Sequence, residues 1–266
     1  MYRYEGLLTH ESHDDDGIIE IIECKGVRSL HFGSSSRQSS IRLDNPEQLE
    51  LNYVRAMMSW LLFKETPENT LVIGLGGGSL TKYLLYHFAD IQIKVIECRK
   101  SVVKIARSHF ALPFDPRLKI IVDDGGDYVR KRAESAENTY NLLFLDAFDH
   151  DGMAESVRSE AFFDACKNLL RSDGMMVLNL WGTDKALFEQ VSWWLGRIFK
   201  WRLLFLPVPD KGNIICLAFG ERSPILEMKI LHKRAADLEA HFQLGFPDFL
   251  KEFKRNNTQT LTKIIL

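Results

Sequence analysis

A glycine-rich turn and a group of acidic residues downstream of it are the parts of this sequence most suited to chemistry. Gly74, Gly76 and Gly78 follow an apolar run at 71–73, and Ser79 begins a helical pattern. Glycines let the backbone turn sharply and approach a ligand closely, and the following helix offers free N–H groups. The turn predicts a nucleotide-like ligand, although any tight strand-to-helix joint favours glycine.

An acid closes the next strand-like run. Glu97 ends the run at 93–97, roughly 20 residues beyond the glycine turn, which is where a ribose-binding acid is expected. Its two oxygens suit the two hydroxyls of a ribose. The alternative is an acid that caps the following helix.

Three further acids follow the third strand-like run. Asp124 is placed to accept a hydrogen bond from an adenine amino group. Asp123 and Asp127 compete for this role, and Asp127 is equally suited to capping the next helix.

Another set of carboxylates follows the fourth strand-like run. Asp146 ends this run, and Asp149, His150 and Asp151 lie just beyond it. These carboxylates predict a negative pocket that holds a cationic amine and accepts a proton from its nitrogen. The alternatives are a strand-end cap at Asp146 and an exposed loop after it. A metal held by residues 149–151 would need further ligands, so we predict no metal.

The elements that position these residues alternate between strands and helices from residue 70 onward. The expected strands are 71–73, 93–96, 119–122, 142–145, 175–180, 203–206 and 214–219, and the expected helices are 79–89, 100–109, 125–135, 158–171 and 185–199. This alternation predicts an α/β fold with a doubly wound, mostly parallel, seven-stranded sheet, whose ligands bind at the carboxyl ends of the strands. Residues 207–213 are too few for a helical crossover, so the last two strands form an antiparallel hairpin. That ending favours an AdoMet-dependent transferase over an NAD-dependent dehydrogenase.

The rest of the chain is divided into two smaller pieces. Residues 1–45 contain short β-rich runs and predict a small antiparallel β domain, in which Asp14–16 form a solvated turn. Residues 46–220 form the AdoMet-type domain, with 46–65 as a joining helix that opens at Asn45-Pro46. Residues 221–266 form a helical extension with helices near 224–243 and 247–254, and its tail has no evident core partner.

Composition and net charge argue against nucleic acid and membranes as partners. A net charge of −2 and a pI near 6.5 give no general attraction to nucleic acid or to an anionic membrane. The four cysteines form no C-x-x-C pair, and no run of apolar residues is long enough to span a membrane. The N-terminus lacks the pattern of a signal peptide. We expect a cytoplasmic protein that acts on small molecules.

With these residues placed, residues 18–220 resemble the spermidine synthase (polyamine aminopropyltransferase) family. The glycine turn, Glu97 and Asp124 match the family's nucleoside-binding positions, and Tyr53 matches its tyrosine facing the amine site. The segment from Tyr140 to His150 is similar to its acidic motif. The resemblance implies a homodimer and the transfer of an aminopropyl group from decarboxylated AdoMet to an amine such as putrescine, releasing methylthioadenosine. Asp146 would orient or deprotonate the amine, and Asp149 would bind its cation.

The sequence departs from that family at the amine end. The family's Gly-Gly-Gly-Asp-Gly motif, whose Asp holds the amine of the aminopropyl arm, continues here as Ser79-Leu80. Val54 replaces a glutamine, His150 replaces a proline, and residues 207–210 lack a tyrosine found in the family. Serine leaves room for the carboxylate of AdoMet itself, so a methyltransferase on the same fold is the alternative. A non-catalytic nucleoside- or polyamine-binding relative is the second alternative.

Overall fold

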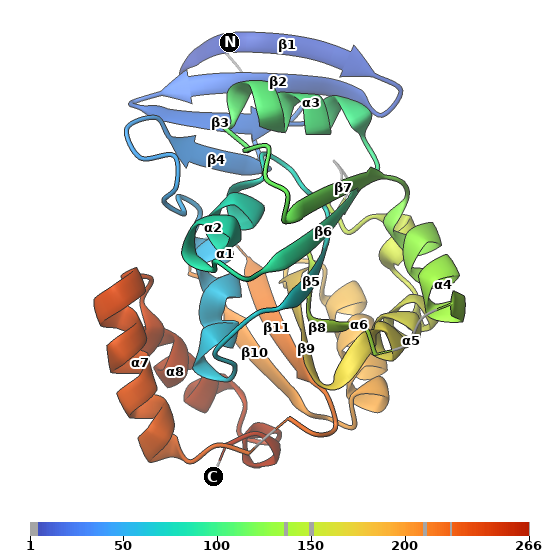
Figure 1. The fold of residues 1–266 in the computed structure, drawn as a ribbon, viewed down its shortest axis with the longest axis vertical. Coiled ribbons are helices and arrows are strands. Elements are labelled where there is room, and N and C mark those ends of the chain that lie inside the picture. Colours follow the sequence, from blue (N-terminus) through green and yellow to red (C-terminus); the bar gives the residue numbers. More distant parts are fainter. Residues whose placement is uncertain (1–4, 136–137, 149–151, 210–211, 224, 266) are drawn as a thin grey trace.

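The chain folds into two sheets with helices around the larger one (Figure 1). The computed structural model describes residues 5–135, 138–148, 152–209, 212–223 and 225–265. Among the helices it describes, none has the length and apolar character needed to cross a membrane.

The smaller sheet is antiparallel and formed by the N-terminal residues. Its strands lie in the order β1-β2-β3-β4, with bounds Leu7–Asp14, Gly17–Cys24, Val27–His31 and Ser39–Arg42. The apolar residues Ile19, Ile21 and Leu30 are fully buried against helix α3 (Lys100–His109). The small antiparallel β domain expected before the larger sheet in the sequence is therefore present.

Strand β1 is an element that the sequence did not predict. Its side chains are largely polar, and Leu7 and Leu8 remain 68% and 46% exposed, so it has no clear apolar face. The solvated turn expected at Asp14–16 is reduced to two residues. Asp14 itself ends β1, and its carboxylate binds the guanidinium of Arg99 at 2.6 Å, which joins the two sheets' domains.

The larger sheet confirms the doubly wound fold. Its strands have the bounds Asn69–Ile73 (β5), Gln92–Glu97 (β6), Leu118–Val122 (β7), Tyr140–Leu145 (β8), Leu170–Trp181 (β9), Leu203–Pro207 (β10) and Asn213–Phe219 (β11). They lie in the order β10-β11-β9-β8-β5-β6-β7. Strands β5 to β9 pair in parallel, and β11 is antiparallel to both β9 and β10, which is the expected closing hairpin.

Helices cover both faces of this sheet. Besides α3 they are Asn52–Met57 (α1), Ser79–His87 (α2), Gly125–Ser135 (α4), Glu160–Leu169 (α5), Lys185–Ile198 (α6), Met228–Phe242 (α7) and Phe246–Asn256 (α8). Leu71 and Ile73 point to the face covered by α4, α5 and α6, whereas Val72 points to the face covered by α1, α2, α7 and α8. This alternation is the period of two that a buried strand requires.

Two expectations about segments outside the sheet are wrong. The joining helix begins at Asn52 instead of near Asn45, because residues 45–48 form a turn in which Gln48 N–H donates to the Asn45 carbonyl. A proline after asparagine suits such a turn as well as a helix start. The tail does have core partners, since Ile264 and Ile265 are buried beneath α7 and α8. The side chain of Asn257 also bonds to the backbone of Phe205 in β10.

Candidate functional site

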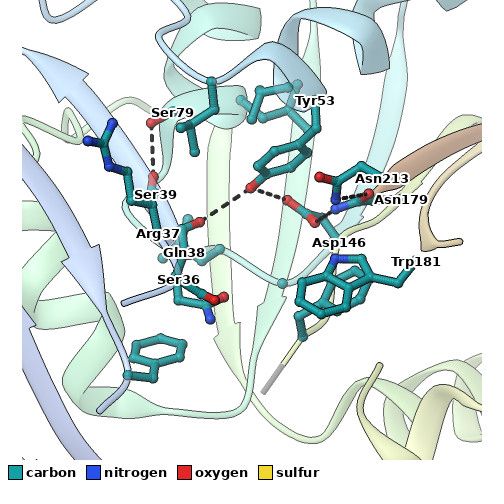
Figure 2. A pocket seen from close by; sticks show the side chains of 18 of the residues that line it. Ser36, Arg37, Gln38, Ser39, Tyr53, Ser79, Asp146, Asn179, Trp181 and Asn213 are labelled. Atoms are coloured by element: carbon teal, nitrogen blue, oxygen red, sulfur yellow. Dashed lines mark hydrogen bonds between the residues drawn. The ribbon is translucent and has the colours of Figure 1, made fainter. Parts of the chain in front are cut away.

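A cavity of about 570 Å³ lies at the carboxyl ends of the parallel strands. It is bounded by the glycine turn after β5, by the residues after β8, by the last residues of β9, by α1 and by the segment between β3 and β4. Figure 2 shows side chains from these separate elements facing one another across it. This is the location expected for the ligand of a doubly wound sheet.

Asp146 is held at the wall of this cavity by side-chain hydrogen bonds. The hydroxyl of Tyr53 lies 3.2 Å from its Oδ2 atom and 3.3 Å from the carbonyl oxygen of Gln38. One hydroxyl hydrogen can serve only one of these acceptors at a time. The structure therefore brings together Asp146 and Tyr53, which are 93 positions apart in the sequence.

Two asparagines that the sequence analysis missed complete this network. The Nδ2 of Asn179 donates to Oδ1 of Asp146 at 2.9 Å, and the Nδ2 of Asn213 donates to Oδ1 of Asn179 at 2.9 Å (Figure 2). Asn179 is only 3% exposed. The available signal was an amide within an otherwise apolar strand, because a buried polar side chain needs a partner.

The surroundings change the acidity of the two central groups. Burial raises the pKa of Asp146, and the hydrogen bonds from Asn179 and Tyr53 oppose that rise. Burial also raises the pKa of Tyr53 well above its ordinary value, and the adjacent Asp146 carboxylate adds to the effect. Asp146 is therefore a stronger proton acceptor than an ordinary aspartate, while Tyr53 keeps its proton at neutral pH.

The glycine turn reaches the same part of the site through its backbone. Gly74 has φ of +93°, and a Cβ added there would lie 2.2 Å from the carbonyl oxygen of Asp146. Gly76 and Gly78 also have positive φ, at +53° and +76°. Gly74 must be glycine, because both its conformation and the close approach of residue 146 exclude a side chain.

Ser79 links the start of α2 to strand β4. Its hydroxyl donates to the carbonyl of Ser40 at 3.1 Å and lies 3.0 Å from the hydroxyl of Ser39. Ser79 also contributes to the cavity lining, although it is only 8% exposed. A serine here is a neutral group, so it cannot supply the charge of an aspartate.

Glu97 is buried where β6 ends, and its carboxylate binds backbone groups. Oε2 accepts from the N–H of Leu75 in the glycine turn, and Oε1 accepts from the N–H of Arg99, each at 2.9 Å. Glu97 thus stabilises the glycine turn through the backbone of Leu75. Oε1 also accepts from the thiol of Cys98 at 3.5 Å. Oε2 keeps a further lone pair, and binding of ribose stays a prediction.

The acids after β7 serve the start of helix α4. The Oδ1 of Asp124 accepts from the N–H of Asp127 at 2.9 Å, so Asp124 has the capping role that the sequence also allowed for Asp127. The Oδ1 of Asp123 accepts from the N–H of Asp124. Asp127 instead pairs with Arg130. The adenine role of Asp124 stays a prediction.

The expected second acid of the amine site cannot be placed. Asp149, His150 and Asp151 lie outside the described residues. Within the part of the chain that is described, no group of three or more acidic, histidine or cysteine side chains is arranged to hold a metal ion.

Comparison with known proteins gives concordant matches. Residues 50–209 match the family model described as the spermine/spermidine synthase domain. The chain is 34% identical to a polyamine aminopropyltransferase of Chromobacterium violaceum over 249 residues, which is 93% of this chain and 94% of the relative.

Two solved structures share the fold. A spermidine synthase in complex with the transition-state analogue AdoDATO superimposes with a TM-score of 0.72 at 16% identity, covering 96% of this chain and 88% of that one. Human methyltransferase-like protein 13 in complex with SAH gives a TM-score of 0.67 at 25% identity, covering 73% of this chain and 93% of that one. The family match and the full-length relative together show that this chain is a transferase and belongs to the spermine/spermidine synthase family.

Proposed function

We propose that this protein transfers an aminopropyl group from decarboxylated AdoMet to a small amine such as putrescine, releasing methylthioadenosine. Family membership supports the class of reaction. The single structural observation that carries the proposal is the Asp146 carboxylate, held by Tyr53 and Asn179 in the cavity that also contains the glycine turn.

The proposed reaction is a displacement at the carbon next to the sulfonium. The amine nitrogen forms a bond to that carbon, the carbon–sulfur bond breaks, and its electron pair stays on the sulfur of methylthioadenosine. An amine must lose a proton to react in this way. Asp146 accepts that proton, and the pKa raised by burial favours the transfer.

Tyr53 and Asn179 position this carboxylate. When the Tyr53 hydroxyl donates to Asp146 and not to the Gln38 carbonyl, Tyr53 and Asn179 bind different oxygens of the carboxylate, which restricts its rotation. Asn213 in turn orients the amide of Asn179, because its Nδ2 occupies the Asn179 oxygen and leaves the Asn179 Nδ2 directed at Asp146. Asp149 stays a proposed binder of the amine's cation, and Glu97 and Asp124 stay proposed binders of ribose and adenine.

A methyltransferase is the second candidate, and Ser79 is the observation that favours it. Without an acid at this position, the ammonium of the aminopropyl arm lacks the charged partner described for the family. The similarity to human methyltransferase-like protein 13, whose structure contains SAH, is consistent with a donor that keeps its carboxylate.

Product analysis separates the two candidates. The purified protein is incubated with putrescine and either decarboxylated AdoMet or AdoMet, and the amine product is identified by mass spectrometry. Aminopropylated amine formed only from decarboxylated AdoMet is the expected result. Methylated amine from AdoMet, with no aminopropylated product, would overturn the proposal in favour of the second candidate.

We also infer a homodimer in the cytoplasm. Strand β1 is the outer strand of the small sheet and exposes Leu7 and Leu8, which supports pairing through the N-terminal sheets. All four cysteines are free, which suits a reducing compartment. Light scattering after gel filtration tests the assembly, and a monomer at micromolar concentration would contradict it.

A further inference from the structure

Arg37 places a positive charge in a cavity proposed to bind cations. The described lining of the cavity contains two charged side chains, Asp146 and Arg37. Arg37 is exposed, and its guanidinium has no ion pair or hydrogen bond with any residue that the structure describes. An unpaired cation is an unexpected lining for a site that takes a diamine and an aminopropyl donor.

Neighbouring arginines show that this lack of a partner is particular to Arg37. On the same sheet, Arg28 binds the carboxylate of Glu23. Arg42, at the end of β4, binds both oxygens of Asp44, the closer contact being 2.7 Å. Of these three arginines, Arg37 is the one whose charge remains available to a ligand.

The backbone beside Arg37 is fixed by both sides of the cavity. The Gln38 carbonyl lies 3.3 Å from the Tyr53 hydroxyl, and the Gln38 N–H donates to the Leu30 carbonyl at 2.9 Å. Ser39 lies 3.0 Å from the Ser79 hydroxyl. In Figure 2 the side chain of Arg37 extends on the side of Ser39, away from Asp146. The cation and the carboxylate therefore occupy opposite sides of one cavity.

This arrangement complements a ligand with both kinds of charge. A guanidinium forms paired hydrogen bonds with a carboxylate, and it repels an ammonium group. We propose that Arg37 binds a carboxylate carried by one of the two substrates in this cavity. The inference rests on the proposed function only in that the cavity takes a sulfonium donor and an amine acceptor. Decarboxylated AdoMet and putrescine carry no carboxylate, so the inference changes the identity of one of these two substrates.

The carboxylate has two possible sources, and each has a partner molecule that lacks it. AdoMet differs from decarboxylated AdoMet by the carboxylate of the donor, and ornithine differs from putrescine by a carboxylate on the acceptor. Calorimetry on the full chain measures the affinity of all four compounds, the two acceptors being titrated in saturating methylthioadenosine. The variants are Arg37→Gln and, as a matched control, Arg42→Gln, which removes a similar charge outside the cavity.

The expected result is a loss of about 10- to 100-fold in affinity for one carboxylate-bearing compound in Arg37→Gln. Its decarboxylated counterpart and methylthioadenosine keep their affinity, and Arg42→Gln changes none of them. Loss confined to AdoMet assigns the carboxylate to the donor and favours the methyltransferase candidate over aminopropyl transfer. Loss confined to ornithine assigns the carboxylate to the acceptor and leaves aminopropyl transfer in place.

Two other results would overturn the inference. If Arg37→Gln binds every compound as the wild type does, or weakens all of them equally, Arg37 recognises no carboxylate, and the proposed function stands unaffected. If the wild type binds neither donor nor methylthioadenosine, the proposed function fails and the inference fails with it.

Discussion

The proposed nucleoside side and the proposed amine side of the site use their carboxylates differently. On the nucleoside side, Glu97 and Asp124 lie outside the described lining of the cavity. Each accepts hydrogen bonds from backbone N–H groups and so stabilises the turn that it is expected to serve. On the amine side, Asp146 is held by the side chains of Tyr53 and Asn179. The first pair therefore combines a structural role with proposed binding, whereas Asp146 is held by side chains in the position proposed for proton transfer, where burial raises its pKa.

Gly74, where the two sides meet, gives the largest expected effect. In Gly74→Ala the new Cβ would lie 2.2 Å from the Asp146 carbonyl at a φ of +93°. We expect a loss of about 4 kcal/mol or more in the free energy of unfolding, or no folded protein. Gly76→Ala is the matched control. Its Cβ would meet nothing closer than 3.6 Å at a φ of +53°, and it should cost only about 1–2 kcal/mol. Equal losses in urea unfolding would contradict the contact.

Asp146→Asn tests the chemical role of the amine side. We expect turnover to fall about 100-fold or more, because asparagine accepts no proton, while the donor binds with unchanged affinity. Steady-state kinetics and donor titration measure the two quantities separately. A parallel loss of donor affinity would instead assign Asp146 to the nucleoside side.

Glu97→Gln sharpens the structural half of the comparison. The amide would place a donor against the N–H of either Leu75 or Arg99. We expect a loss of about 1–3 kcal/mol in the free energy of unfolding. Thermal unfolding measured beside Asp146→Asn provides the contrast, and a larger loss in Asp146→Asn than in Glu97→Gln would reverse the comparison.

The pH dependence of stability follows from the raised pKa of Asp146. A carboxyl group whose pKa is higher in the folded state favours folding in its protonated form, and that contribution is lost as pH rises through the raised pKa. Asp146→Asn should therefore be at least as stable as the wild type at neutral pH, and this advantage should shrink on acidification. Urea unfolding across this pH range measures it, and an advantage that grows on acidification would contradict the assignment.

The asparagine pair gives the smallest expected effect. Asn179→Ala removes a hydrogen bond that lowers the pKa of Asp146, so the acidic limb of the pH–activity profile should move to higher pH. Asn213→Ala acts only through Asn179 and should move it less. At pH values below that limb, the activity of Asn179→Ala should be about tenfold lower than that of the wild type. A larger shift in Asn213→Ala would rule out this order of action.

The sequence was sufficient for the features that are local in the chain. Glycine spacing, strand-end acids and a short final connection correctly predicted the glycine turn, the doubly wound sheet and the closing hairpin. Contacts between segments that lie far apart in the sequence could not be predicted from local patterns. Strand β1 lacks an apolar face, and Ile264 and Ile265 of the tail are buried in a core to which α7 and α8 contribute.

The same limit applies to the site. Tyr53 and Asp146 were identified separately from the residues and the family resemblance, but their hydrogen bond depends on how α1 packs beside β8. Asn179 and Asn213 face each other only because β9 and β11 pair antiparallel, with Asn179 opposite Ile215 in the register. A strand pattern shows that a residue is buried, and it does not show which neighbour satisfies it.

The most direct test of the proposed reaction is the release of methylthioadenosine from decarboxylated AdoMet by the wild type and by Asp146→Asn at saturating donor. Release that depends on added putrescine in the wild type, and falls about 100-fold or more in the variant, is the predicted result. Equal release by the two proteins would contradict the assignment of proton transfer to Asp146.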